Sequence, residues 1–136
     1  MAKRKVYVTK KATFEAAHHL KNYDGKCSQI HGHSYKLEVT FSGFINPTDI
    51  SDKSPATEAM VCDFNHLKKI IGEVVGKFDH NDLNYYFEQP TAECMVIDIY
   101  HTLERLIGVS DFNVHSVKLW ETEDSFAEYK GEVENE

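Results

Sequence analysis

The 136-residue sequence lacks an excess of basic side chains: 15 Lys and Arg face 22 Asp and Glu, for a formal net charge of −7. Nucleic acids and anionic membranes are bound through a basic face, so this balance argues against both as general partners. Long apolar runs are lacking too, and none approaches the roughly 18 residues needed to span a bilayer. No apolar segment follows the basic start, so we expect no signal peptide.

Cysteine is scarce. The three cysteines at positions 27, 62 and 94 cannot all pair, and none belongs to a CxxC motif. This argues against a disulfide framework and a four-cysteine zinc ribbon, and it favours a soluble, cytoplasmic protein. Repeats and low-complexity tracts are also lacking. We expect one domain over residues 1–136, with an acidic C-terminal end, about 131–136, that frays.

Hydrophobic residues, at 41% of the chain, are sufficient for a core, and their spacing predicts its elements. The expected elements are strands over 6–18 and 31–43, an exposed loop over 45–60, helices over 64–78 and from Pro90-Thr91 to about 107, and strands over 113–122 and 126–130. The order ββααββ indicates an α+β fold, an antiparallel sheet with two helices on one face. Its open edges favour pairing with other copies of the chain.

Histidine is abundant, with eight in the chain. His31 and His33 are two apart on a predicted strand, so they project to one side, and a hairpin can bring His18 to them. Three imidazoles without a fourth protein ligand are typical of a catalytic zinc site. The alternative is a set of ordinary hydrogen-bonded histidines. We expect the remaining histidines to be ordinary, apart from one discussed below: these are His19, His66, His101 and His115.

Three further features carry possible chemistry. Cys27, in the loop before His31, is either a base or nucleophile near the metal or an incidental loop cysteine. Asp79-His80, between the helices, is either an oriented proton carrier or a structural turn, and the residues alone favour the turn. Glu121 continues the apolar face that we predict for His115, Val117 and Leu119. It either holds two N–H donors of a planar heterocycle or forms an internal salt bridge.

Together these residues resemble the 6-pyruvoyl-tetrahydropterin synthase family, and more closely its bacterial 6-carboxy-tetrahydropterin synthase branch in queuosine (7-deazaguanine) biosynthesis. The matching segments, in order between about 6 and 130, are Phe14-Glu-Ala-Ala-His18, Cys27-Ser-Gln-Ile-His31-Gly-His33-Ser-Tyr35, Met60-Val-Cys-Asp63-Phe64, Phe78-Asp79-His80-Asn-Asp-Leu-Asn84, Pro90-Thr91-Ala-Glu93 and Trp120-Glu121-Thr122. Cys27 stands four residues before His31, where the pyruvoyl-forming animal enzymes have a longer insertion. One position departs: His19 stands where the family usually has Arg.

The resemblance implies a tunnelling fold whose subunits join their sheets into a barrel, usually a hexamer of two trimers with sites between subunits. It implies zinc on His18, His31 and His33, with Cys27 as the proton acceptor. The implied roles of the other residues are proton relay for His80, its orientation for Asp79, pterin anchoring for Glu121, and support of the substrate site for Thr91 and Glu93.

The expected function is therefore a zinc-dependent lyase that converts 7,8-dihydroneopterin triphosphate to 6-carboxy-tetrahydropterin, with release of acetaldehyde and triphosphate. Zinc would act there as a Lewis acid. One alternative is the pyruvoyl branch, which eliminates triphosphate without cleaving a carbon–carbon bond. The other is a non-catalytic domain with a structural metal, which would need a fourth protein ligand but neither His80 nor Glu121.

Overall fold

The computed structural model describes residues 2–47 and 59–135, and its main elements follow the order predicted from the sequence. The elements are β1 (Arg4–His18), η1 (Lys26–Ser28), β2 (His31–Ile45), α1 (Phe64–Phe78), β3 (Asn81–Asp82), η3 (Leu83–Tyr85), α2 (Ala92–Ile107), β4 (Phe112–Thr122) and β5 (Ser125–Tyr129). Most of the loop predicted over 45–60 lies outside the described residues. Among the helices described, none is both long and apolar enough to cross a membrane.

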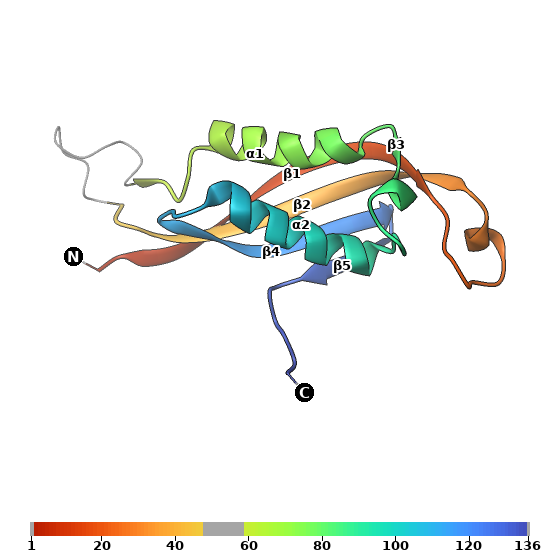
Figure 1. Ribbon diagram of the computed structural model, residues 1–136. Coiled ribbons are helices and arrows are strands. Elements are labelled where there is room, and N and C mark those ends of the chain that lie inside the picture. Colours follow the sequence, from red (N-terminus) through yellow and green to blue (C-terminus); the bar gives the residue numbers. More distant parts are fainter. Residues whose placement is uncertain (1, 48–58, 136) are drawn as a thin grey trace.

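The strands form one sheet in the order β3-β1-β2-β4-β5. β1 and β2 pair antiparallel along their whole length, from Arg4 opposite Ile45 to His18 opposite His31. Both helices lie on the same face of this sheet (Figure 1). The predicted α+β architecture is confirmed. The two-residue β3 was not predicted; it pairs parallel with β1 at Ala16 and Ala17 and forms one sheet edge.

The core lies between the helices and the inner face of the sheet. Alternate residues of β2 supply its centre: Tyr35, Leu37, Val39 and Phe41 are each at most 1% exposed. The helices cover them with side chains at helical spacing, which are Leu67, Ile71, Val74 and Phe78 of α1 and Met95, Ile99 and Leu103 of α2. This burial supplies most of the driving force for the fold.

Both helices begin where the sequence predicts, each after a residue whose side chain caps it. The Asp63 carboxylate accepts a hydrogen bond from the Asn65 N–H at 2.8 Å, and the Thr91 hydroxyl accepts one from the Cys94 N–H at 3.1 Å. Each cap satisfies a donor that has no partner within its helix. The terminal turns are less buried than the periodicity indicates, since Phe64 is 52% and Leu106 39% exposed.

β4 departs from the predicted alternation. Its pairing with β2 shifts register, so that Thr40 pairs with Ser116 but Phe41 pairs with Val114. His115 is the extra residue of this bulge, which moves it off the face of the core. The prediction that His115 shares the face of Leu119 is therefore wrong. Its ring packs edge-on against the exposed Tyr7, with 4.6 Å between ring centroids.

At the acidic C-terminal end, residues 131–135 form neither helix nor strand. That this end frays stays a prediction.

Candidate metal and active site

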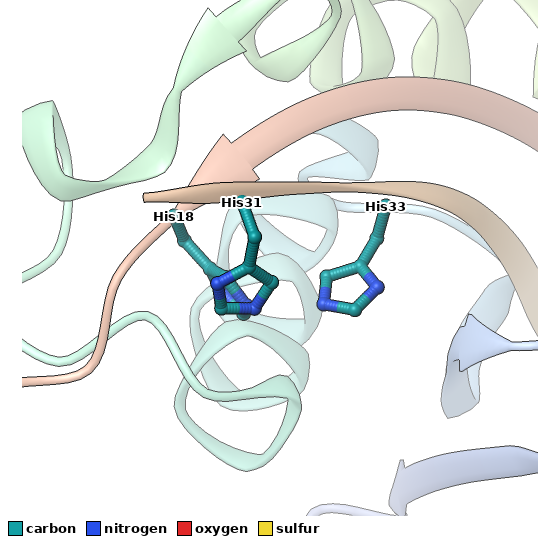
Figure 2. A group of neighbouring side chains, drawn as sticks. All are labelled: His18, His31 and His33. Atoms are coloured by element: carbon teal, nitrogen blue, oxygen red, sulfur yellow. The ribbon is translucent and has the colours of Figure 1, made fainter. Parts of the chain in front are cut away.

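The hairpin of β1 and β2 brings three histidines together. His18 stands opposite His31, and His33 stands opposite Ala16, two residues before His18. Residues two apart on a strand project to the same side, so the three side chains share the inner face. Figure 2 shows the rings gathered on one side of the strands, with His18 and His31 close together. One nitrogen from each ring lies within 4.8 Å of the others, as the hairpin argument predicted.

Two backbone carbonyls orient these rings. The Nδ1 of His18 lies 2.8 Å from the carbonyl oxygen of Pro90, and the Nδ1 of His31 lies 2.7 Å from that of Gln29. Because a carbonyl only accepts, each Nδ1 carries the proton and donates it. A metal-ligating histidine is typically held in this way, since the bond fixes its tautomer and leaves Nε2 as the ligand atom.

The Nε2 atoms of His18 and His31 face each other at 3.0 Å. With both Nδ1 atoms protonated, each neutral ring presents a lone pair there, and two lone pairs at this distance repel one another. A cation coordinated by both nitrogens removes that repulsion. The donor set therefore fits a metal ion, and imidazole suits zinc among other transition metals.

Glu121 adds negative charge beside the rings. Its Oε1 lies 3.2 Å from Nε2 of His18 and 3.6 Å from Nε2 of His33. Burial is the main cause that lowers the pKa of His33. Glu121 opposes this shift, while His18 and His31 add to it. A lowered pKa favours the neutral imidazole, which is the form that binds metal. Glu121 thus has histidines as its neighbours within the chain, and these contacts become ion pairs only when a ring is protonated.

Cys27 lies on the loop that joins the histidine-bearing strands. It belongs to the short helix η1, its thiol is free, and the residue is partly buried. Its carbonyl accepts a hydrogen bond from the Leu20 N–H at 2.7 Å, which closes the loop on itself two residues after His18. Cys27 thus lies in the connection between the two strands that carry the clustered histidines.

Asp79 and His80 form the predicted pair, with 3.0 Å between Asp79 Oδ1 and His80 Nδ1. The same oxygen accepts the Glu15 N–H at 3.0 Å, and this hydrogen bond is the main cause that lowers the pKa of Asp79. His80 has a φ of 60° and is 79% exposed in its side chain. In the described part of the chain, the cluster of possible metal ligands contains His18, His31 and His33 but not this pair.

The pair instead lies at the β3 edge of the sheet. His80 borders a groove of about 470 Å³ whose lining also includes Glu15, Ser34 and His33. Asp79 therefore has a structural function at β1 and also orients His80. The contact with Glu15 agrees with the structural interpretation, and a role of the pair in carrying protons stays a prediction.

Thr91 and Glu93, expected near the substrate, lie at the start of α2. Thr91 is the N-cap, and the residue before it supplies the carbonyl that orients His18. Thr91 thus contacts the site through the backbone of Pro90. Glu93 is exposed in the first turn of the helix. A direct contact of either residue with substrate stays a prediction.

Some functional contacts have no motif of their own. Tyr35 is 1% exposed, and its hydroxyl lies 3.3 Å from Nδ1 of His18. Strand parity could have predicted this position, because Tyr35 follows His33 by two residues on the same strand face. The carbonyls of Pro90 and Gln29 were not predictable, since every residue carries a carbonyl and only the tertiary fold selects these two.

The fold and the site together define an α+β protein with three clustered histidines that could hold a metal ion at one end of its sheet. Comparison with known proteins gives the family: residues 7–132 match the family model described as 6-pyruvoyl tetrahydropterin synthase. The chain therefore belongs to the 6-pyruvoyl tetrahydropterin synthase family, as its motifs predicted.

Individual relatives agree with this assignment. A protein of Archaeoglobus fulgidus named putative 6-carboxy-5,6,7,8-tetrahydropterin synthase is 37% identical over 118 residues, covering 87% of this chain and 90% of its own. The 6-carboxy-5,6,7,8-tetrahydropterin synthase of Haemophilus influenzae is 32% identical over 145 residues, covering 90% and 97%. The structure of 6-pyruvoyl tetrahydropterin synthase from Caenorhabditis elegans superimposes with a TM-score of 0.79 at 27% identity, covering 97% of this chain and 100% of that one. The predicted fold is confirmed.

Proposed function

We propose that this protein is a carbon–carbon lyase that converts 7,8-dihydroneopterin triphosphate to 6-carboxy-5,6,7,8-tetrahydropterin. The reaction consumes one water, releases acetaldehyde and triphosphate, and belongs to queuosine biosynthesis, in the cytoplasm. One observation carries the proposal: the Nε2 atoms of His18 and His31 converge beside Glu121 in a chain of this family. Relatives named 6-carboxy-5,6,7,8-tetrahydropterin synthase at 37% and 32% identity support this branch.

In this proposal His18, His31 and His33 hold one zinc ion through their ring nitrogens. When bound, zinc supplies Lewis-acid polarisation of the substrate's side-chain hydroxyls. The carbonyls of Pro90 and Gln29 keep His18 and His31 in the ligating tautomer. Glu121 stabilises the cationic centre through its Oε1, and its carboxylate accepts N–H donors from the edge of the pterin ring.

Cys27 is proposed to accept a proton from a carbon of the substrate side chain. A nearby cation favours the thiolate, which is the basic form, over the thiol. His80, oriented by Asp79, is the proposed proton carrier. Because the pair lies at the β3 edge of the sheet, we propose that it acts in the site of a neighbouring copy. This agrees with the homohexamer and the shared sites that the resemblance implies.

Product analysis tests the proposal against the pyruvoyl branch. Purified, zinc-loaded protein is incubated with 7,8-dihydroneopterin triphosphate, and the aldehyde and pterin products are identified by mass spectrometry. The proposal predicts acetaldehyde and 6-carboxy-tetrahydropterin in equal amounts. Triphosphate release with 6-pyruvoyl-tetrahydropterin and no acetaldehyde would assign the chain to the other branch.

The matched variant for this assay is Cys27→Ala, which removes the proposed base while leaving the three histidines in place. We expect zinc to stay bound and turnover to fall by about 100-fold or more, the usual size of a lost general base. Full turnover in Cys27→Ala with zinc still bound would contradict the assignment of Cys27.

A further inference from the structure

Two side-chain amides fasten the chain just after His18. Asn84 accepts the His19 N–H at 2.8 Å and donates to the His19 carbonyl at 3.1 Å. Gln89 accepts the Lys21 N–H at 2.8 Å and donates to the Lys21 carbonyl at 2.9 Å. Each amide therefore bonds both backbone polar groups of one residue, as a neighbouring strand would.

These amides prolong the edge of the sheet beyond its last backbone pair. β3 pairs with Ala16 and Ala17 of β1, and the same segment then continues along residues 18–21. The segment itself is anchored, since Leu83 is fully buried and Pro90 is buried. Residues 21–26 of the opposite loop are all exposed, so the loop has little packing of its own to fix its position.

Leu20, which lies between His19 and Lys21, forms a backbone hydrogen bond with Cys27. His19 and Lys21 bond toward Asn84 and Gln89, whereas the Leu20 N–H donates to the Cys27 carbonyl at 2.7 Å. One short stretch thus connects the anchored segment on one side to the backbone of Cys27 on the other.

We propose that Asn84 and Gln89 are positioning residues that set the place of Cys27 relative to His18, His31 and His33. The inference rests on the proposed role of Cys27 as the base. A carboxamide suits this task because it carries a donor and an acceptor side by side, which matches the N–H and C=O of one residue. A carboxylate lacks the donor, and an apolar side chain of the same size lacks both.

The test uses Asn84→Leu and Gln89→Met, which keep side-chain size and remove both hydrogen bonds. The full-length, zinc-loaded protein is treated with iodoacetamide, and alkylation of each cysteine is followed by peptide mass spectrometry. We expect the alkylation rate of Cys27 to change severalfold while that of Cys94, on α2, stays at the wild-type value. The zinc content should stay unchanged. kcat for the pterin should fall by about 10- to 100-fold with little change in KM, because moving the Cys27 thiol by about 1 Å relative to the substrate slows proton transfer by such a factor.

The matched control is Asn81→Leu. Its carboxamide donates to the Lys77 carbonyl at 2.9 Å, a bond of similar length that leads to α1 rather than to the loop. Asn81→Leu should keep the wild-type alkylation rate of Cys27. Should a Leu or Met variant fail to fold, Asn84→Asp and Gln89→Glu take its place, because they keep the acceptor and lose only the donor. They should change the alkylation rate of Cys27 in the same direction.

Two results would overturn the inference: wild-type alkylation of Cys27 in both amide variants, or equal changes at Cys27 and Cys94, which would indicate general loosening. A wild-type protein that does not consume the pterin would refute the proposed function instead. The alkylation comparison would still decide whether the amides position Cys27.

Discussion

Single residues determine whether the three-histidine cluster binds metal. Its two closest rings are oriented by carbonyls, so their lone pairs converge before any ion arrives. Because the rings are already oriented, they need little rearrangement when a metal binds. Outer contacts of this kind typically contribute about 10- to 100-fold in metal affinity.

Removal of one ring should therefore weaken metal binding by more than about 100-fold, the upper range for the loss of an outer contact alone. We expect this of His31→Ala in a competition titration with a chromogenic zinc chelator. His101→Ala is the control, because His101 pairs with Glu104 on the exposed surface of α2. Equal zinc affinities of the two variants would refute the assignment of His31.

Tyr35 gives a prediction for pH. Burial is the main cause that raises the pKa of its hydroxyl above the ordinary value, and Glu121 adds to this shift. In the unfolded chain the hydroxyl ionises near pH ~10. Its contribution to stability is thus complete below that pH. As the pH rises further, the unfolded state loses its proton first, and stability falls until the folded-state group ionises too.

Urea unfolding of metal-free protein between about pH 9 and 11 measures this effect. Tyr35→Phe should lose stability less steeply than the wild type above pH ~10, by at most about 1.4 kcal/mol per pH unit for one proton. Parallel slopes for the two proteins would show that the hydroxyl of Tyr35 is not perturbed.

Residue patterns predicted this site unevenly. Strand parity placed His18, His31 and His33 on one face, because a regular antiparallel hairpin preserves that parity along its whole length. The same argument failed for His115, because a bulge adds one residue to β4 and no local motif indicates it.

At the scale of elements, the start of α2 connects the stability of the helix to the histidine cluster. Thr91 caps the helix, and the preceding Pro90 carbonyl orients His18. α1 has a similar cap in Asp63. In the described structure, no residue next to Asp63 forms a hydrogen bond with the clustered histidines, as Pro90 does. The two caps therefore form a matched pair.

We expect Thr91→Ala and Asp63→Ala each to lower the free energy of unfolding by about 1 kcal/mol, the usual value of an N-cap. Only Thr91→Ala should also weaken zinc binding, and Thr91→Ser should restore both properties. Denaturant unfolding and zinc titration of the three variants measure this. Zinc affinity reduced equally by both alanine variants would contradict the connection through Pro90.

The long elements were predictable and the short ones were not. Both caps and both helices could be read from side-chain type and periodicity. β3 and η3 contain two and three residues, too few for any period to be recognised, and tertiary contact with β1 determines them.

For the whole molecule, the order of elements was sufficient to predict the α+β sheet, and the motifs predicted the family. The sequence could not show that Asp79-His80 lies at the β3 edge and is not one of the clustered possible metal ligands, because β3 was not predicted. That position supports the proposal that a neighbouring copy completes each active site.

Mixing two inactive variants tests the shared site. Cys27→Ala lacks the proposed base, and His80→Asn lacks the imidazole while keeping a residue type that tolerates a positive φ. In a one-to-one mixture co-assembled at random, about a quarter of the sites receive both intact residues from different subunits. Activity should return to about that fraction. No recovery in verified mixed oligomers would place Cys27 and His80 of one chain in one site.

The most direct test of the central claim is a zinc titration of the metal-free protein in the presence of 7,8-dihydroneopterin triphosphate, with acetaldehyde as the readout. The account predicts that acetaldehyde formation is absent without metal, rises in proportion to added zinc and levels off at one ion per chain. The His31→Ala variant should stay inactive throughout. Full acetaldehyde formation by metal-free protein, or none at saturating zinc, would contradict the account.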